Sequence, residues 1–250
     1  MTLQEFFHNN PRAALAFSGG ADSAYLLWAA REWAEDVKAY YVHSPFQPAF
    51  ELADAKRLAE ELGMPMTVLE ADVLSVPGAA ANGPDRCYHC KTALFTLLKE
   101  AALADGYTLL IDGTNASDDA GDRPGMRALR ELAVRSPLRE CGVTKAEVRT
   151  RSREAGLFTW DKPAYACLAT RVPTGTAITP EALSAVEGAE KALAALGYRD
   201  FRVRLFHGAA RLELTERDFA RAAEAREAVK AALSPWFETV LLDFAVRTGG

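Results

Sequence analysis

Cysteine is scarce in this chain, and long runs of apolar residues are missing. Four cysteines among 250 residues do not form the disulfide framework of a small secreted domain, and such cysteines are more often buried, catalytic or metal-bound. No apolar stretch is long enough to cross a bilayer, so we expect no membrane partner. Thr2 and Glu5 form a capping box that predicts a short amphipathic helix rather than a signal peptide, which favours a cytoplasmic location.

Basic residues are not in excess either. The formal net charge is −5, which argues against a protein whose main task is to bind nucleic acid. The apolar fraction of 49% and the charged fraction of 25% are ordinary for a globular protein, and the length allows one large domain or two modest ones.

Apolar runs alternate with amphipathic segments in the first part of the chain. The expected strands are residues 13–17, 37–43, 66–70 and 107–112, and the expected helices are residues 22–34, 48–62, 90–104 and 124–133. This alternation predicts an α/β domain over residues 1–175, with a parallel sheet covered by helices on both faces. Ligands of such sheets bind at the carboxyl ends of the strands.

The pattern changes after a less regular stretch at residues 114–176. The expected elements there are a helix at 180–196, strands at 201–206 and 210–214, a helix at 216–232 and a strand at 238–245. We interpret residues 176–250 as a smaller α+β domain.

A glycine-rich turn lies between the first expected strand and the helix after it. Its polar and glycine residues are Ser18, Gly19, Gly20, Asp22 and Ser23. The glycines let the backbone approach an anion, and the unpaired N–H groups at the start of the helix point at it. Asp22 would cap the helix or hold Mg²⁺. Gly113 follows the fourth expected strand, at the same edge of the sheet, so we expect a phosphate site there.

The turn is not a Walker A loop, because it contains no lysine. Its pattern Ser-Gly-Gly-x-Asp-Ser resembles the PP-loop of the ATP pyrophosphatase superfamily, whose fold is adenine nucleotide alpha hydrolase-like. The resemblance implies ATP and Mg²⁺ as ligands. It also implies cleavage of ATP between the α and β phosphates, with AMP left on an oxygen of the substrate.

Three of the cysteines lie in segments that suggest chemistry. Cys87 and Cys90 form a C-x-x-C motif that we place on a loop leading into a helix at 91–99. The motif alone fits half a zinc site, a redox pair, part of an iron–sulfur site or two unrelated buried thiols. Cys167 is followed by Arg171, whose charge would favour the thiolate.

Two arginines alternate along the expected strand 201–206. Arg202 and Arg204 share one face of that strand, while its apolar residues face the core. Two guanidinium groups on a rigid strand would bind a phosphate, and a solvated strand face is the alternative.

Other polar residues carry weaker patterns. Glu190 and Glu213 would bind a divalent metal or orient substrate, or else they are ordinary surface carboxylates. Cys141 has no partner pattern and is interpreted as structural. We interpret His43 and His89 as histidines that do not bind a ligand.

Several further segments, taken with the loop, resemble the LarE family of ATP-dependent sulfur transferases, which help to make the nickel-pincer nucleotide cofactor. They are residues 86–91, 112–115, 123–125, 136–138, 156–157, 160–163 and 167–171. The resemblance spans nearly the whole chain, and Cys-Leu-Ala-Thr-Arg at 167–171 is its most specific piece. The family usually has Ser where Thr170 stands, a change that keeps the hydroxyl.

The resemblance implies that ATP adenylylates a carboxylate of pyridinium-3,5-biscarboxylic acid mononucleotide, and that a sulfur nucleophile displaces AMP to give a thiocarboxylate. In one branch of the family, cysteines matching Cys87, Cys90 and Cys167 hold a [4Fe–4S] cluster whose fourth iron carries an extra sulfide. In the other branch, the cysteine matching Cys167 donates its sulfur and becomes dehydroalanine. Because all three cysteines are present, we favour the cluster branch.

The resemblance also implies the partners of the reaction. It places the substrate phosphate at Arg202 and Arg204, and it implies sulfide or a sulfur-delivery protein as the sulfur source. It further suggests a homo-oligomer, specifically a hexamer.

Three other functions stay open. A PP-loop tRNA thiolase is disfavoured by the acidic net charge. An amidating synthetase would need an ammonia source, and residue 2 is Thr2 rather than a cysteine nucleophile. A non-catalytic nucleotide-sensing protein would release no pyrophosphate with any acid substrate.

Overall fold

The computed structural model describes residues 1–118 and 124–247 of the chain. The chain divides into two compact units, the first made of residues 1–79 and 85–164 and the second of residues 80–84 and those from 165 onward. The second unit therefore begins before residue 176, where the sequence suggested a division. It includes residues 80–84 because the Asn82 side chain donates hydrogen bonds to the carbonyls of Pro173 and Thr176, both at 2.9 Å.

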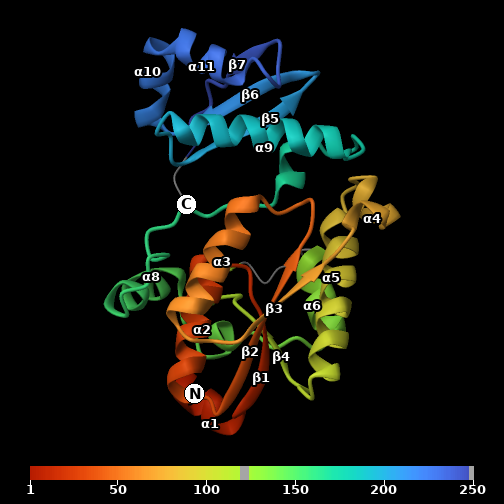
Figure 1. Cartoon of the computed structure of the whole chain (residues 1–250), viewed down its shortest axis with the longest axis vertical. Helices are drawn as coiled ribbons and strands as arrows, with labels where there is room; N and C mark the ends of the chain where they lie inside the picture. The colour runs from red at the N-terminus through yellow and green to blue at the C-terminus, as the bar shows by residue number, and fades with distance from the viewer. Residues whose placement is uncertain (119–123, 248–250) are drawn as a thin grey trace. The chain divides into compact units, whose positions relative to one another are not determined.

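Four parallel strands form the sheet of the first unit, in the order β3-β2-β1-β4 (Figure 1). They are β1 (Arg12–Ala16), β2 (Asp36–His43), β3 (Met66–Glu70) and β4 (Leu110–Asp112). The parallel α/β sheet expected from the sequence is thus confirmed. Strand β4 is shorter than the expected 107–112, because the Tyr107 N–H donates to the Ala102 carbonyl and closes the preceding helix instead.

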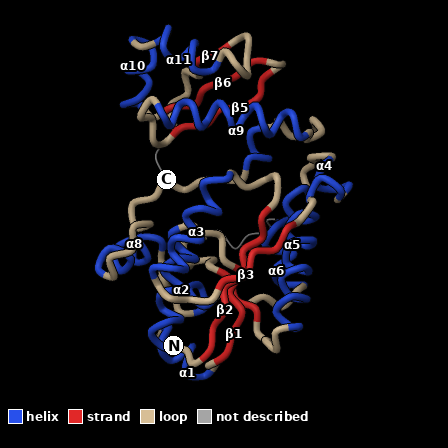
Figure 2. Tube along the Cα trace, viewed as in Figure 1, coloured by secondary structure: helices blue, strands red, loops and turns tan. Residues whose placement is uncertain are grey.

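Helices surround this sheet (Figure 2). They are α1 (Leu3–Asn9), α2 (Ala21–Trp33), α3 (Ala49–Glu61), η1 (Val73–Ser75), α4 (Pro77–Ala80), α5 (Arg86–Ala104), α6 (Pro124–Glu131), α7 (Pro137–Glu140) and α8 (Lys145–Glu154). The capping box of Thr2 and Glu5 at the start of α1 is confirmed. Helix α8 was not expected. Across the described ranges, no helix has both the length and the apolar character needed to span a membrane.

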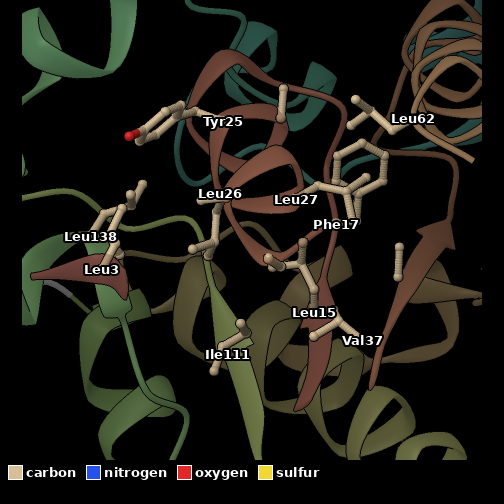
Figure 3. Packing of buried hydrophobic residues seen from close by; sticks show 14 of the residues in the cluster. Leu3, Leu15, Phe17, Tyr25, Leu26, Leu27, Val37, Leu62, Ile111 and Leu138 are labelled. Atoms are coloured by element: carbon tan, nitrogen blue, oxygen red, sulfur yellow. The ribbon is translucent and has the colours of Figure 1, made fainter. Parts of the chain in front are cut away.

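The alternating side chains of the strands build a separate core on each face of the sheet. Leu15 and Val37 face α2, in the cluster drawn in Figure 3. Ala14 and Tyr40 face the other way and pack with Leu98 of α5. This two-sided burial is the reason that the strands are apolar throughout rather than alternating with polar residues.

The second unit has a smaller, mixed sheet in the order β5-β6-β7. Its elements are η2 (Leu168–Arg171), α9 (Pro180–Ala195), β5 (Phe201–Phe206), β6 (Ala209–Leu214), α10 (Glu216–Glu224), α11 (Arg226–Leu233) and β7 (Val240–Leu242). The single helix expected at 216–232 is in fact two helices that meet at Ala225. Strand β7 is shorter than the expected 238–245, because the Asp243 carboxylate accepts the Ala245 N–H at 2.9 Å and turns the chain.

Candidate functional site

The loop between β1 and α2 has a conformation that requires glycine. Gly19 has φ of +71°, and a Cβ added there would lie 3.1 Å from the Glu51 carbonyl oxygen and 3.2 Å from the Ala55 Cβ, both on α3. A side chain at this position would be strained in its backbone and crowded by α3. The loop therefore lies closely against α3 at Gly19.

Two serine hydroxyls hold the shape of this loop. The Ser23 Oγ donates to the Gly20 carbonyl at 3.1 Å, accepts the Ser18 N–H at 3.3 Å and lies 3.1 Å from the Ser18 Oγ. Helix α2 begins with Gly20 at its N-cap and has no side-chain cap there. The N–H groups of the first turn have no acceptor within the helix, so this end attracts an anion.

Asp22 does not cap α2, and that expectation is wrong. It is the second residue of the helix, and its Oδ2 pairs with the Lys145 Nζ at 2.6 Å. Its Oδ1 is buried and has no hydrogen-bond partner among the described residues. An unpartnered buried carboxylate oxygen is costly, and a cation bound there would satisfy it.

A second lysine lies beside the loop. The Lys162 Nζ lies 3.3 Å from the Gly19 carbonyl oxygen and 2.7 Å from the Asp54 Oδ2, and its side chain is 15% exposed. The positive charge that the loop lacks in sequence is thus provided by Lys145 and Lys162, from far along the chain. Lys145 was not predicted from the sequence, although the capping box of Thr144 and Glu147 that starts α8 could have indicated its helix.

The end of β4 approaches the start of α2 very closely. A Cβ added at Gly113 would lie 2.8 Å from the Ser23 nitrogen and 2.9 Å from the Ser23 Cα, so only glycine fits. The neighbouring Asp112 is buried and accepts hydrogen bonds from the hydroxyls of Ser136, at 2.6 Å, and Thr114, at 2.5 Å. The structure therefore brings Gly113 together with the loop residues, as the strand ends predicted.

The C-x-x-C motif lies in a helix rather than on a loop, which corrects the sequence-based placement. Helix α5 begins at Arg86, and the N–H groups of Tyr88 and His89 already donate to the Asp85 carbonyl. Cys87 and Cys90 are three residues apart in this helix and therefore lie on the same side of it. Cys87 is exposed and Cys90 is half-buried.

The two histidines near these elements have protein neighbours. The His43 Nδ1 lies 2.9 Å from the Glu70 Oε2, at the ends of β2 and β3. The His89 ring lies against Gly78, where an added Cβ would be 2.4 Å from it.

Arg123, in one of the segments that resemble the LarE family, lies outside the described residues.

Cys167 is in the second unit, at the N-cap of η2. Its carbonyl accepts the Thr170 N–H at 3.0 Å and the Thr170 hydroxyl at 2.8 Å. Its side chain is half-buried.

A buried ion pair lies beside this segment. The Arg171 Nε and Nη2 donate to the two carboxylate oxygens of Glu190 at 2.7 and 3.1 Å, and both side chains are 5% exposed or less. The Tyr165 hydroxyl donates to the Glu190 Oε2, and the Val203 N–H donates to the Oε1 at 2.9 Å. Burial and the Glu190 charge raise the pKa of Tyr165, so its hydroxyl stays a neutral donor.

The two arginines of β5 differ in exposure. Arg202 is buried, and its guanidinium carbon lies 5.2 Å from the centre of the Tyr165 ring. Burial, together with the positive charges of Arg171 and Arg247, lowers the pKa of Arg202 to about 10. Arg204 is part-exposed and donates to the Thr170 carbonyl and to Glu213. The open, solvated strand face is therefore wrong for Arg202.

Glu213 lies among arginines. Its Oε1 accepts from Arg204 at 2.5 Å and from Arg211 at 3.1 Å, and Arg247 lies 3.8 Å from its Oε2. Within neither unit do three His, Cys, Asp or Glu side chains of the described ranges gather to hold a metal. Metal binding by Glu190 and Glu213 stays a prediction.

Comparison with known proteins gives relatives that match most of the chain. An uncharacterized protein of Synechocystis sp. is 40% identical over 213 residues, which is 85% of this chain and 80% of that protein. The pyridinium-3,5-bisthiocarboxylic acid mononucleotide synthase of Lactiplantibacillus plantarum is 35% identical over 217 residues, which is 86% of this chain and 79% of that protein.

A more distant match covers less of the chain. The tRNA(Ile)-lysidine synthase of Polaromonas naphthalenivorans is 32% identical over 109 residues, which is 42% of this chain and 31% of that protein. This match fits a PP-loop fold. No protein-family model matches. On the similarity to the Lactiplantibacillus synthase, this chain belongs to the LarE family.

Proposed function

We propose that this protein is an enzyme that inserts sulfur into pyridinium-3,5-biscarboxylic acid mononucleotide, with ATP as the activating reagent. The similarity to the Lactiplantibacillus synthase carries the proposal, because it covers 86% of the chain and so extends into both units. That similarity supports sulfur insertion into a nucleotide. The use of ATP is supported by the geometry of the loop.

The loop fits a triphosphate and a magnesium ion. The unpaired N–H groups of α2 and the two lysines would bind phosphate oxygens. The unpartnered Asp22 Oδ1 is the hard oxygen ligand that Mg²⁺ prefers. Bound there, the ion would neutralise charge on the phosphates.

The proposed activation makes a good leaving group. A substrate carboxylate oxygen attacks the α-phosphorus of ATP, the bond to the β-phosphate oxygen breaks, and pyrophosphate leaves. A sulfide then attacks the acyl carbon, and AMP leaves with the original carboxylate oxygen and its bonding electrons. The products are a thiocarboxylate, AMP, pyrophosphate and a proton.

Three cysteines fit a soft metal cluster by their chemistry. Cys87 and Cys90 lie one helical turn apart on α5, and Cys167 would supply the third thiolate from the second unit. A [4Fe–4S] cluster held in this way would leave one iron open to a sulfide from solution or from a sulfur-delivery protein.

Cys167 as the sulfur donor is the alternative. Its thiolate would attack the acyl adenylate and form a thioester, with loss of AMP. Removal of the Cys167 α-proton would then expel the thiocarboxylate and leave dehydroalanine, so each chain would act once.

The arginines of β5 would bind the substrate phosphate. The pKa of Arg202 is lowered by burial and by neighbouring positive charges, and a phosphate beside it would offset that repulsion. Arg204 would need to share its guanidinium group between Glu213 and the phosphate.

The proposal also includes the state of the protein: a homo-hexamer in the cytoplasm that binds no nucleic acid.

One experiment tests the reaction and separates its two forms. Protein purified anaerobically is analysed for iron and sulfide, then incubated with the biscarboxylate nucleotide, Mg-ATP and sulfide. We expect thiocarboxylate, AMP and pyrophosphate in equal amounts, and no product from Cys167→Ala. Unchanged protein mass with bound iron supports the cluster form, and loss of hydrogen sulfide mapped to Cys167 supports the donor form.

Other outcomes would favour the rival functions. Thiolated nucleosides formed only when tRNA is added would point to a tRNA thiolase. ATP binding without pyrophosphate release for every acid tested would point to a nucleotide sensor. Either result, with no thiocarboxylate formed, contradicts the proposal.

A further inference from the structure

Glu190 is the point at which three separate segments of the second unit meet. Its carboxylate accepts four hydrogen bonds, two from Arg171, one from Tyr165 and one from the Val203 N–H. Each oxygen accepts two of them, which fills the acceptor capacity of a carboxylate. To coordinate a metal, Glu190 would first have to release one of these donors.

The partners of Glu190 lie on both sides of Cys167. Tyr165 is two residues before the cysteine, and Arg171 is four residues after it. Arg171 also donates through its Nη1 to the Ala166 carbonyl at 3.0 Å and to the Thr170 hydroxyl at 2.8 Å. The backbone on either side of Cys167 is therefore tied to one buried carboxylate.

The same carboxylate ties this segment to β5. The Val203 N–H lies between Arg202 and Arg204 in sequence, so Glu190 contacts the strand at the position of the two arginines. The Tyr165 ring adds a second link, because it lies 4.6 Å from the Arg171 guanidinium carbon and 5.2 Å from that of Arg202.

We propose that Glu190 is a positioning residue for Cys167. Through Tyr165 and Arg171 it fixes the cysteine segment against the strand that would bind the substrate phosphate. The inference rests on the proposed function for the role of Cys167, and it gives Glu190 a role other than metal binding. A sulfur held at a fixed distance from the bound substrate reacts faster than one on a loose segment, with little change in substrate affinity.

Tyr165→Phe is the variant that tests this proposal with the least disturbance. It removes one hydroxyl from Glu190 and keeps the aromatic ring beside the arginines. We expect the rate of thiocarboxylate formation at saturating nucleotide to fall about tenfold, while the nucleotide concentration that gives half of this rate stays within about twofold, since the lost contact acts on the sulfur and not on the phosphate. Tyr198→Phe is the matched control in the same unit, because its ring faces Arg221 rather than Glu190.

A second readout does not depend on turnover. The full chain, reduced and freed of iron by chelation, is alkylated with iodoacetamide, and the rate at each cysteine is followed by peptide mass spectrometry. We expect Tyr165→Phe to change the Cys167 rate at least threefold and to leave the rates of Cys87 and Cys90 unchanged. If Glu190→Gln folds, it should change the alkylation rate of Cys167 further. If it does not fold, the alkylation rate of Cys167 in Tyr165→Phe tests the proposal alone.

The outcomes separate this inference from the function on which it rests. If the wild-type chain makes no thiocarboxylate, the proposed function fails, whereas the alkylation rates still test the positioning. Unchanged alkylation of Cys167 in Tyr165→Phe overturns the positioning role. The positioning role is also overturned if Glu190→Gln loses Mn²⁺ binding but Cys167 is alkylated at the wild-type rate, because Glu190 would then be a metal ligand.

Discussion

The loop of the first unit and the Cys167 segment of the second unit are held in shape by different kinds of residue. The loop is shaped by Gly19 and by serine hydroxyls, and the ion pair beside it, Lys145 with Asp22, has side chains that are 32% and 25% exposed. The Cys167 segment is shaped by Arg171 and Glu190, whose side chains are almost fully buried.

The difference matches what each region would do. A site that receives a charged ligand needs neutralising groups that can change partner, and lysines in part-exposed ion pairs do so at a lower cost than fully buried ones. A segment that presents one atom needs groups that cannot move, and a buried, fully hydrogen-bonded ion pair fixes its neighbours. We therefore expect changes in the second unit to affect stability most, and changes at the loop to affect ligand binding most.

The largest effect is expected from breaking the buried pair. Arg171→Met leaves the Glu190 carboxylate buried without its counter-charge and should lower the free energy of unfolding by about 3–5 kcal/mol. Urea unfolding followed by circular dichroism measures this loss. The double variant Arg171→Met with Glu190→Met should regain much of the stability but not the activity. A single variant as stable as the wild type would contradict the comparison.

The next largest effect is expected at Lys162. Lys162→Met should weaken ATP binding by about tenfold to hundredfold, because charge-assisted hydrogen bonds to phosphate contribute about 1.5–3 kcal/mol. Isothermal titration calorimetry with a non-hydrolysable ATP analogue measures the affinity. Lys56→Met, at an exposed position on α3, is the matched control. Equal affinities of the two variants would remove Lys162 from the proposed ATP site.

A smaller effect is expected from the glycine of the loop. Gly19→Ala forces a side chain into a left-handed backbone and against α3, and should cost about 1–2 kcal/mol of stability. Gly20→Ala is the control, because a Cβ there meets only the Ser18 Oγ at 3.5 Å and the backbone is not left-handed. Thermal unfolding should show that Gly19→Ala is less stable than Gly20→Ala, and the reverse result would contradict the loop geometry.

The smallest effect is expected at the helix that carries Lys145. The Thr144 N–H and hydroxyl hold the pKa of Glu147 below its ordinary value near 4.5, so the carboxylate stabilises the folded chain above that pH. This stabilisation is lost as the pH falls through the folded pKa. Glu147→Gln should therefore be less stable than the wild type at pH 7, and this difference in stability should shrink as the pH falls below 4.5. If the difference in stability between Glu147→Gln and the wild type does not shrink at acidic pH, the charge of Glu147 is not its cause.

Local patterns were enough to predict the first unit's sheet and its loop. The strand, the glycine turn and the helix at residues 13–34 follow one another directly, and every signal lies within a few residues of the element it predicts. The ends of the other strands and helices expected in this unit lie within two residues of those observed, apart from the first residues of β4 and of α5. There, Asp85 stands just before Arg86 as the N-cap, and this cap-type residue could have placed the cysteines in the helix.

Long-range partners could not be predicted in the same way. Lys145 and Lys162 lie more than 120 residues after the loop they contact, and no spacing rule connects them to it. The alternation along β5 identified the arginine face but not its burial, because Tyr165, which covers Arg202, comes from another segment. The buried role of Glu190 on α9 likewise depends on partners from two other segments, the Cys167 segment and β5.

The most direct test of the central claim follows the oxygen that sulfur replaces. The biscarboxylate nucleotide is prepared with ¹⁸O in its carboxylates and incubated anaerobically with the protein, Mg-ATP and sulfide, and the nucleotides are analysed by mass spectrometry. We predict that AMP carries one ¹⁸O for each sulfur inserted, while pyrophosphate carries none. Unlabelled AMP, or ADP with labelled phosphate in its place, would contradict the adenylylation on which the account depends.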